Sequence, residues 1–418
     1  MAATKAVEIL NNISETITDK DTDLLKKIAI TSMTGKGAEY SKEHLAEITV
    51  KAIKQVAEKN GEIYTISKED VKIEKKVGGS VKDTELVKGI VVDKERVHPG
   101  MPKIVENAKV MLLDSALEIK DTETDAKITI TDPMQLQSFV DQEEKMLRNM
   151  VDEISKTGAQ AVFCQKGIDD LAQHFLAKAG IYAARRVKKS DMEALAKSTG
   201  AKLVTKLRDA EKTDLGFAGI IEQRKIGDEE MTFVMGCKNP KAVTILIRGG
   251  TTHIIDEIKR AVEDAIGVIS TVFRTGKAVA GAGSVEIELA RQLRKYSSSL
   301  EGREQLAVQA FADSMESIPT TLAENAGIDP IDIITELRAA HDKGQKNAGI
   351  DVFTGKTSDA WKKGVIEPLS VKIQAVSSAA EVAEMILRID DVISGATSGA
   401  HPPPPRGMDG MGGMGGMM

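Results

Sequence analysis

Apolar residues recur at helical spacing from the first residues of the chain. Val7, Leu10 and Ile13 share one helical face, so we expect residues 1–14 to form the end of a helix. A second helical region follows Thr18 and stops at residues 34–37, where two glycines flank Lys36. Another amphipathic helix follows, with these apolar positions: Leu45, Ile48, Ile53 and Val56.

Residues 63–98 change to strand character, with a turn at Gly78-Gly79. Short apolar strands then alternate with helices, which is typical of an α/β unit whose helices cover a sheet. The predicted elements are strands at 161–164, 181–184 and 202–205, a helix over 169–179, and a helix after Ser190. Ser190 and Glu193 match a capping box, which predicts that Ser190 caps that last helix.

Residues 131–158 predict one long helix that interrupts this alternation. Asp132 can cap it, Pro133 suits its first turn, and an apolar stripe rich in methionine follows. The stripe consists of Phe139, Val140, Met146, Leu147, Met150, Val151 and Ile154. The helix either faces the core of its own domain or offers an adaptable contact surface to a partner, and periodicity does not separate the two.

The last part of the chain is predicted to be mainly helical. A strand over 243–250 leads into a helix whose apolar face places Asp264 on the polar side, one turn after Arg260. After a Gly281-Ala282-Gly283 turn we expect helices over 284–296, over 304–318 with an end at Pro319, from Asp329-Pro330 to Ala340, and over 370–393. The Pro-rich and Gly/Met-rich residues 401–418 are expected to be disordered.

Composition narrows the function classes. A chain of 418 residues is too long for one core, so several domains are expected. A net charge of −6 with mixed signs argues against nucleic acid as a partner, and no apolar run reaches the roughly 18 residues of a membrane span. The two cysteines without CxxC spacing indicate a reducing, cytoplasmic setting, and the six scattered histidines predict no metal cluster.

Candidate chemistry lies between residues 260 and 293. An acidic side chain, Asp264, precedes a glycine turn at a helix N-terminus, where free N–H groups and the helix dipole favour an anion. An ion pair of Asp264 with Arg260 accounts for the same carboxylate without any function. Lys36 is either an exposed loop lysine or a mobile cation for a phosphate.

Four stretches carry a resemblance to a known family. They are AARRVKKSDMEALAK, REQLAVQAFADSMESIPTTLAENAG, NAGIDVFTGK and the closing Gly-Met repeats. Together with matches from Thr18 onward, they resemble the archaeal thermosome family of group II chaperonins. The resemblance implies a multidomain α/β and α-helical subunit of an ATP-dependent chaperone that binds and folds unfolded polypeptides, with ATP binding and hydrolysis driving lid closure. Its implied partners are unfolded polypeptides and other subunits of a double ring.

The resemblance also implies a domain layout. Residues 1–14 would end a first equatorial segment, 15–92 and 248–278 would form the intermediate domain, 93–247 the apical domain and 279–400 the second equatorial segment. The helix at about 131–158 would be the helical protrusion that serves as a built-in lid.

Site residues follow from the same match. Asp264 resembles the hinge-domain aspartate that orients water for attack on the γ-phosphate, a catalytic role. Gly281, Ala282 and Gly283 match the nucleotide-contacting turn, with alanine in place of the family's middle glycine. Asp351 and Glu367 match positions near the adenine and ribose, and Lys36 matches a nucleotide-sensing lysine.

Family subunits also carry a phosphate loop and a Gly-Asp-Gly-Thr-Thr motif whose aspartate holds Mg²⁺, and neither occurs in this sequence. The implied cofactors are therefore ATP and Mg²⁺, with no metal ligand predicted here, and ATPase activity is left open. We expect the 418-residue chain alone neither to hydrolyse ATP at family rates nor to assemble the ring. The alternative function is a binding module that holds unfolded polypeptides without cycling; an unrelated α/β enzyme is disfavoured because no catalytic His or Cys constellation is visible.

Overall fold

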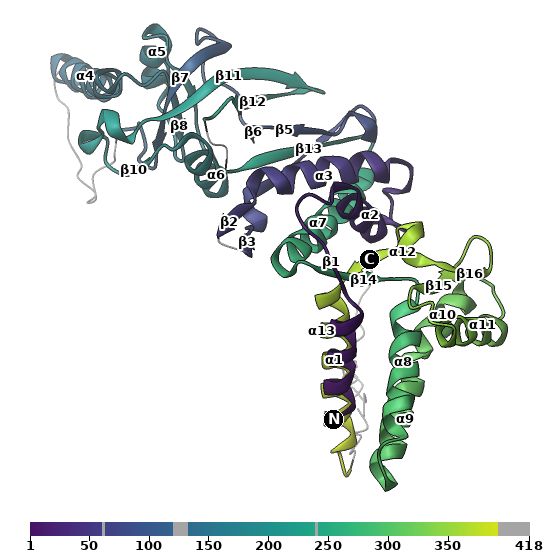
Figure 1. Ribbon diagram of the computed structural model, residues 1–418. Helices are drawn as coiled ribbons and strands as arrows, with labels where there is room; N and C mark the ends of the chain where they lie inside the picture. The colour runs from purple at the N-terminus through teal and green to yellow at the C-terminus, as the bar shows by residue number, and fades with distance from the viewer. Residues whose placement is uncertain (61–62, 120–132, 239–240, 392–418) are drawn as a thin grey trace, which may run out of the picture.

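The computed structural model describes residues 1–60, 63–119, 133–238 and 241–391. Three bodies follow one another in an elongated arrangement (Figure 1). We call them the sheet body, residues 89–238; the hinge body, residues 17–87 and 243–275; and the helical body, residues 1–16 and 276–391. In the described part of the chain no helix is long and apolar enough to cross a membrane.

The sheet body is built on a mixed seven-stranded sheet in the order β6-β12-β11-β7-β8-β9, with β10 beside β7. Its strands are β6 (Gly89–Val92), β7 (Ile104–Leu113), β8 (Ala161–Cys164), β9 (Tyr182–Ala184), β10 (Leu203–Val204), β11 (Gly216–Ile226) and β12 (Glu229–Met235). Strands β7, β8 and β9 run parallel, and β8 is buried at all four positions, as expected for a strand covered on both faces. Helices α5 (Asp170–Lys178) and α6 (Lys189–Thr199) follow β8 and β9, which confirms the predicted α/β character.

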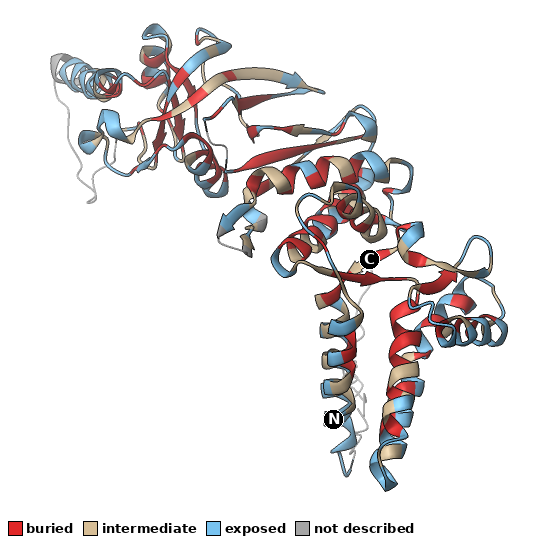
Figure 2. Cartoon of the chain, viewed as in Figure 1, coloured by how far each residue is buried: buried red, intermediate tan, exposed pale blue. Residues whose placement is uncertain are grey.

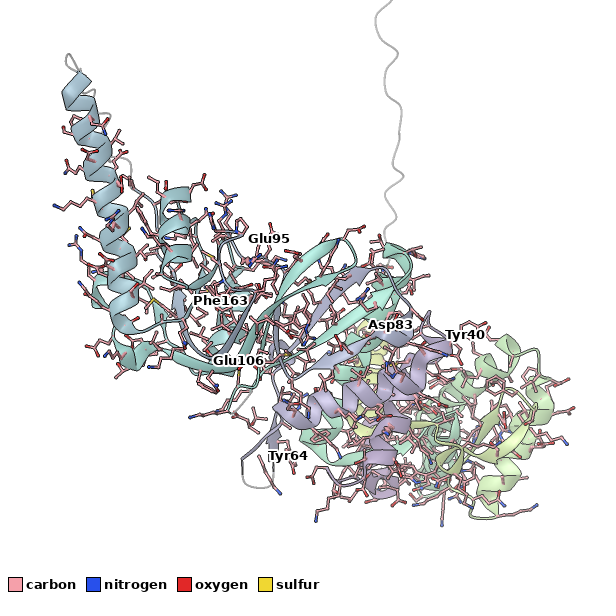
Figure 3. The ribbon with its side chains drawn as sticks, turned by 90° about the horizontal axis from the view of Figure 1, so that it is seen from above. Tyr40, Tyr64, Asp83, Glu95, Glu106 and Phe163 are labelled. Atoms are coloured by element: carbon pink, nitrogen blue, oxygen red, sulfur yellow. The ribbon has the colours of Figure 1, made fainter. Side chains whose placement is uncertain are left out.

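Helix α4 (Pro133–Thr157) stands out from the sheet body in Figure 3. Its second half packs into the core, because Leu147, Val151 and Ile154 are buried. Its first half is open, with Phe139 40% and Val140 48% exposed. The core-facing interpretation is therefore confirmed for the second half, while a contact surface for a partner stays a prediction for the exposed first half. The predicted cap Asp132 lies outside the described residues.

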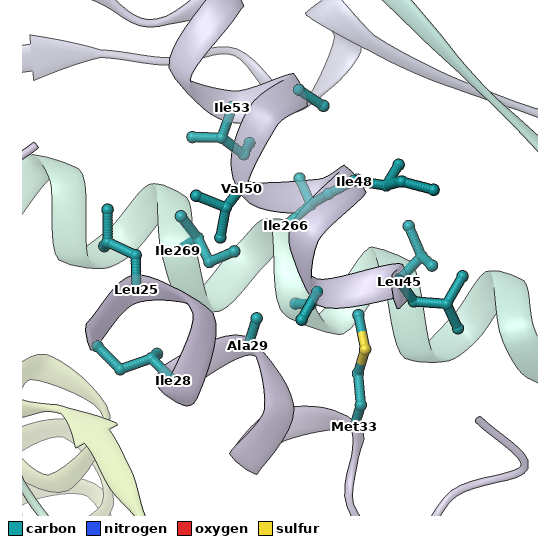
Figure 4. Packing of buried hydrophobic residues seen from close by; sticks show 14 of the residues in the cluster. Leu25, Ile28, Ala29, Met33, Leu45, Ile48, Val50, Ile53, Ile266 and Ile269 are labelled. Carbon is teal, nitrogen blue, oxygen red and sulfur yellow. The ribbon is translucent and has the colours of Figure 1, made fainter. Parts of the chain in front are cut away.

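The hinge body joins two distant regions of the chain. Helices α2 (Thr22–Met33), α3 (Lys42–Val56) and α7 (Thr252–Thr275) pack beside a sheet in the order β4-β13-β5, formed by β4 (Val71–Val77), β13 (Val243–Gly249) and β5 (Glu85–Val87). A hairpin of β2 (Glu58–Asn60) and β3 (Ile63–Thr65) follows α3. Figure 4 shows Leu25 of α2, Val50 of α3 and Ile269 of α7 close to one another between the three helices, so the apolar face predicted for α7 lies in the core of this body.

The helical body contains the two remaining small sheets and most of the helices. Its helices are α1 (Ala2–Ile13), α8 (Ser284–Ser297), α9 (Gly302–Met315), α10 (Ser317–Asn325), α11 (Pro330–Asp342), α12 (Ala360–Lys363) and α13 (Leu369–Leu387). Strands β1 (Glu15–Thr16), β14 (Lys277–Ala280) and β17 (Ile366–Pro368) form one sheet, and β15 (Ala348–Asp351) pairs with β16 (Lys356–Asp359). Helix α1 packs against α13 and α8, so the two ends of the described chain share a core.

Three local predictions are wrong. Helix α6 begins at Lys189 with no side-chain cap, so Ser190 is not the cap; Asp191 is instead buried and paired with Lys72 of the hinge body at 2.7 Å. The single helix predicted over 304–318 is two helices, α9 and α10, and Pro319 lies in the first turn of α10, where its missing N–H has no helical partner to lose. Helix α13 ends at Leu387, before the predicted end at residue 393.

Candidate functional site

The turn of Gly281, Ala282 and Gly283 leads from β14 into α8. Ala282 and Gly283 have φ angles of 57° and 75°, so alanine takes the left-handed conformation that glycine favours. A Cβ on Gly281 would lie 2.7 Å from Glu367 Oε1, and one on Gly283 would lie 2.7 Å from Pro319 Cβ. Position 283 therefore requires glycine, and a side chain at position 281 would displace Glu367; the alanine at position 282 still adopts the turn.

Helix α8 starts at this turn without a side-chain cap. The Ser284 N–H donates to the Gly281 carbonyl at 3.1 Å, so the later N–H groups of the first turn and the helix dipole are what favours an anion here. Figure 2 shows the first half of α8 as buried, and all residues from Ser284 to Ala290 are. The N-terminus of α8 is consequently held rigidly by the surrounding core.

Strand β15 packs directly on the turn. The Ile350 N–H donates to the Ala282 carbonyl at 2.9 Å, and a Cβ on Gly349 would lie 2.9 Å from the same oxygen. This contact brings Asp351, the last residue of β15, beside the turn. Burial alone would raise the pKa of Asp351, but hydrogen bonds from the Phe353 backbone and from Thr354 and Lys363 outweigh it and lower the pKa, so the carboxylate stays charged.

Glu367 on β17 is held from the other side. The Lys372 ammonium lies 2.9 Å from Glu367 and 2.8 Å from Glu286 in the first turn of α8. Burial by itself would lower the pKa of Lys372, but the two carboxylates outweigh it and raise the pKa above its ordinary value. The second oxygen of Glu286 is buried without a hydrogen-bond partner.

Asp264 and Lys36 lie in the hinge body. Asp264 is exposed on α7 and forms an ion pair with Lys36 of the loop between α2 and α3. The predicted pair of Asp264 with Arg260 is wrong, because Arg260 bonds Glu257 at 3.0 Å. Within the described ranges, neither Asp264 nor Lys36 forms a hydrogen bond or ion pair with the glycine turn.

The predicted site residues thus fall into two groups on two bodies. Gly281, Ala282, Gly283, Asp351 and Glu367 form one wall in the helical body, and Lys36 and Asp264 form a pair in the hinge body. The bodies are joined close to the wall: Thr31 of α2 donates its hydroxyl to the Gly364 carbonyl at 3.1 Å.

Sequence reasoning missed the residues that hold this wall in place. They are Glu286, Glu288, His341, Gly349 and Lys372. No motif marks the four residues other than Gly349, because their contacts join segments that are far apart in the chain. The one available signal was the glycine at 349, whose missing side chain allows the close approach to Ala282.

Metal binding has little support in the described part of the chain. There, no group of three or more His, Cys, Asp or Glu side chains is arranged to hold a metal ion. The residues present do not fit a Mg²⁺ site by themselves, although the uncapped α8 N-terminus fits an anionic ligand.

Comparison with known proteins identifies the class. The model of the TCP-1/cpn60 chaperonin family matches residues 1–397, and the chain belongs to this family. It is 62% identical over 393 residues to a thermosome subunit beta of Archaeoglobus fulgidus and 60% identical over 394 residues to a thermosome subunit of Methanopyrus kandleri. Each match covers 94% of this chain and 72% of the relative.

A solved structure gives the same result. The chain is similar to the open-state monomer of a group II chaperonin from Methanococcoides burtonii, with a TM-score of 0.71 and 48% identity over 93% of this chain and 90% of that one. The family resemblance, the multidomain fold class and the function of a group II chaperonin subunit are thereby confirmed.

Proposed function

We propose that this chain uses ATP at the glycine-turn wall, at a rate below that of family subunits that carry the Gly-Asp-Gly-Thr-Thr motif, to drive the folding of polypeptides that it binds on its sheet body. One observation carries the proposal: α7, which bears Asp264, continues through Gly276 and β14 directly into the turn. The hydrolytic carboxylate and the nucleotide wall therefore lie on consecutive elements. A rotation of the hinge body about this connection changes the separation between them.

Each residue has a role in this proposal. The α8 N-terminus and the turn accept phosphate, and Asp351 and Glu367 accept hydrogen bonds from the ribose or adenine end. When bound, ATP supplies the γ-phosphate as the electrophile. Asp264 positions and polarises the attacking water, and Lys36 exchanges its partner Asp264 for the nucleotide. No step is assigned to Mg²⁺.

The three bodies correspond in this proposal to the domains implied by sequence. The sheet body is the apical domain with α4 as its protrusion, the hinge body is the intermediate domain and the helical body is equatorial. The exposed apolar first half of α4 contacts unfolded polypeptides, and neighbouring subunits complete a ring in the cytoplasm.

The test is the recovery of a chemically denatured client enzyme in the presence of this protein, with and without ATP. ATP-dependent recovery that Asp264→Asn abolishes supports the proposal. The same exposed half of α4 also favours the alternative function, a binding module that holds unfolded polypeptides without an ATP-driven cycle. Suppressed aggregation that is indifferent to ATP and to Asp264→Asn would establish that alternative and overturn the ATP-driven function.

A further inference from the structure

His341 is a fully buried histidine that bridges α8 and β15. Its Nδ1 lies 2.7 Å from Glu288 Oε2 on α8, and its Nε2 lies 2.9 Å from the backbone carbonyl oxygen of Ala348, the first residue of β15. The side chain of His341 has no solvent exposure, and that of Glu288 is 3% exposed. Neither contact can be replaced by water without opening this core.

The partners of His341 determine its hydrogen-bonding state. Both are oxygen acceptors, so each ring nitrogen lies against an acceptor, one on α8 and one on β15. Arg291 and Gln292 donate to Glu288 as well, so the buried carboxylate is held by three side chains.

This bridge leads directly to the nucleotide wall. Ala348 precedes Gly349, which lies against the turn, and Ile350, whose N–H donates to Ala282 at 2.9 Å. Helix α8 carries both Glu288 and the N-terminus that begins at the glycine turn. His341 therefore joins α8, which begins at the glycine turn, to β15, which packs on that turn.

We propose that His341 is a positioning residue for nucleotide binding: its two ring-nitrogen contacts, to Glu288 of α8 and to Ala348 of β15, hold β15 against the glycine turn and so set the position of Asp351. The inference rests on the proposed ATP-dependent function. It does not involve Asp264, which lies on the hinge body. Substitution of His341 should consequently change the affinity for nucleotide without changing the rate of the chemical step.

The test compares the wild-type protein with His341→Ala and His341→Gln, and with His253→Ala as the control, since His253 is exposed on α7. We expect the KM for ATP to rise about tenfold in His341→Ala and by a smaller factor in His341→Gln, which keeps one donor, while kcat stays within about twofold. Amide hydrogen exchange of a peptide covering residues 345–355 should accelerate in the same order without nucleotide. The control should match the wild type in both measurements.

The outcomes separate this inference from the proposed function. A wild-type protein that shows no ATP binding or turnover contradicts the proposed function, while faster exchange in the His341 variants still supports the positioning role. A lower kcat at unchanged KM, with unchanged exchange in β15, means that His341 only stabilises the fold and overturns the inference. If His341→Ala does not fold, Glu288→Gln provides the second variant, because it retains the shape but weakens the charge-assisted bond; unchanged exchange and KM in Glu288→Gln also overturn the inference.

Discussion

Lys36 and Asp264 are 228 positions apart in the sequence and form an ion pair on the surface of the hinge body. Their side chains are 37% and 55% exposed, so the pair adds little to stability and either partner is free to exchange. An exposed, exchangeable pair suits the roles proposed for both residues toward a nucleotide. Because the ion pair contributes so little, stability does not explain why a carboxylate stands at position 264.

Asp264→Asn should lower the rate of ATP hydrolysis by about 10²- to 10⁴-fold, because the amide is a poor acceptor for the proton of the attacking water. The affinity for ATP should change little, since Asp264 lies outside the glycine-turn wall. Phosphate release under single-turnover conditions and equilibrium nucleotide binding measure the two effects.

Asp256→Asn is the matched control for that experiment. Asp256 lies on the same helix and forms a comparable exposed pair with Lys75 at 2.6 Å. Hydrolysis should remain at the wild-type rate. An equal loss in both variants would show that general charge on α7, rather than a role of Asp264, is being measured.

Ala282→Gly should raise the free energy of unfolding by up to about 1 kcal/mol. Ala282 has φ of 57°, and glycine adopts this conformation without the steric cost of a Cβ. Glycine also gains entropy in the unfolded chain, which limits the benefit. Chemical denaturation measures the change, and a loss above about 1 kcal/mol would mean that the contact of Ala282 Cβ with Gly349 outweighs the backbone strain.

Gly349→Ala should weaken ATP binding by about tenfold, because the new Cβ would lie 2.9 Å from the Ala282 carbonyl oxygen and displace β15 from the turn. Titration with a fluorescent nucleotide measures the affinity. Gly250→Ala is the control, since no atom lies within 4 Å of the added Cβ there. Wild-type affinity in Gly349→Ala would show that β15 does not shape the site.

Acid should destabilise the helical body between about pH 4.5 and pH 2. Burial opposes ionisation of Glu316, but the guanidinium groups of Arg294 and Arg338 outweigh it and lower the pKa of Glu316 from 4.5 to about 2. A carboxyl group whose pKa is lower in the folded state stabilises the protein at pH values above its pKa in the unfolded state. This stabilisation is lost as the pH falls through the pKa of the folded state. Thermal unfolding from about pH 6 to pH 2 measures the slope, which Glu316→Gln should reduce; an identical slope in the variant would contradict the assignment.

Substitutions in the two halves of α4 should have opposite consequences. Leu147→Ala removes a buried side chain and should cost about 2–4 kcal/mol of stability. Val140→Ser changes an exposed one and should leave stability within about 0.5 kcal/mol, while capture of a denatured polypeptide falls. Chemical denaturation and an aggregation-suppression assay measure the pair, and unchanged capture by Val140→Ser would remove α4 from the client-binding surface.

Local pattern was enough for much of the fold. The apolar stripe of α7 predicted both the helix and its buried face, and Asp329 caps α11 through its side chain as its sequence position indicates. A helix face and a helix cap each involve residues within one or two turns of one another, so their spacing in the sequence is enough to predict them. The glycine turn follows from the sequence for the same reason, since three adjacent residues define it.

Tertiary structure decided the rest, because the relevant interactions join distant segments. The sequence placed Arg260 one turn from Asp264, but the fold brings Lys36 to that carboxylate and Glu257 to the arginine. Periodicity made α4 one continuous stripe, and only packing against the sheet determined that Leu147 is buried and Val140 is not. His341 carries no motif at all; its role arises from Glu288 and Ala348, which approach it only when α8 and β15 share a core.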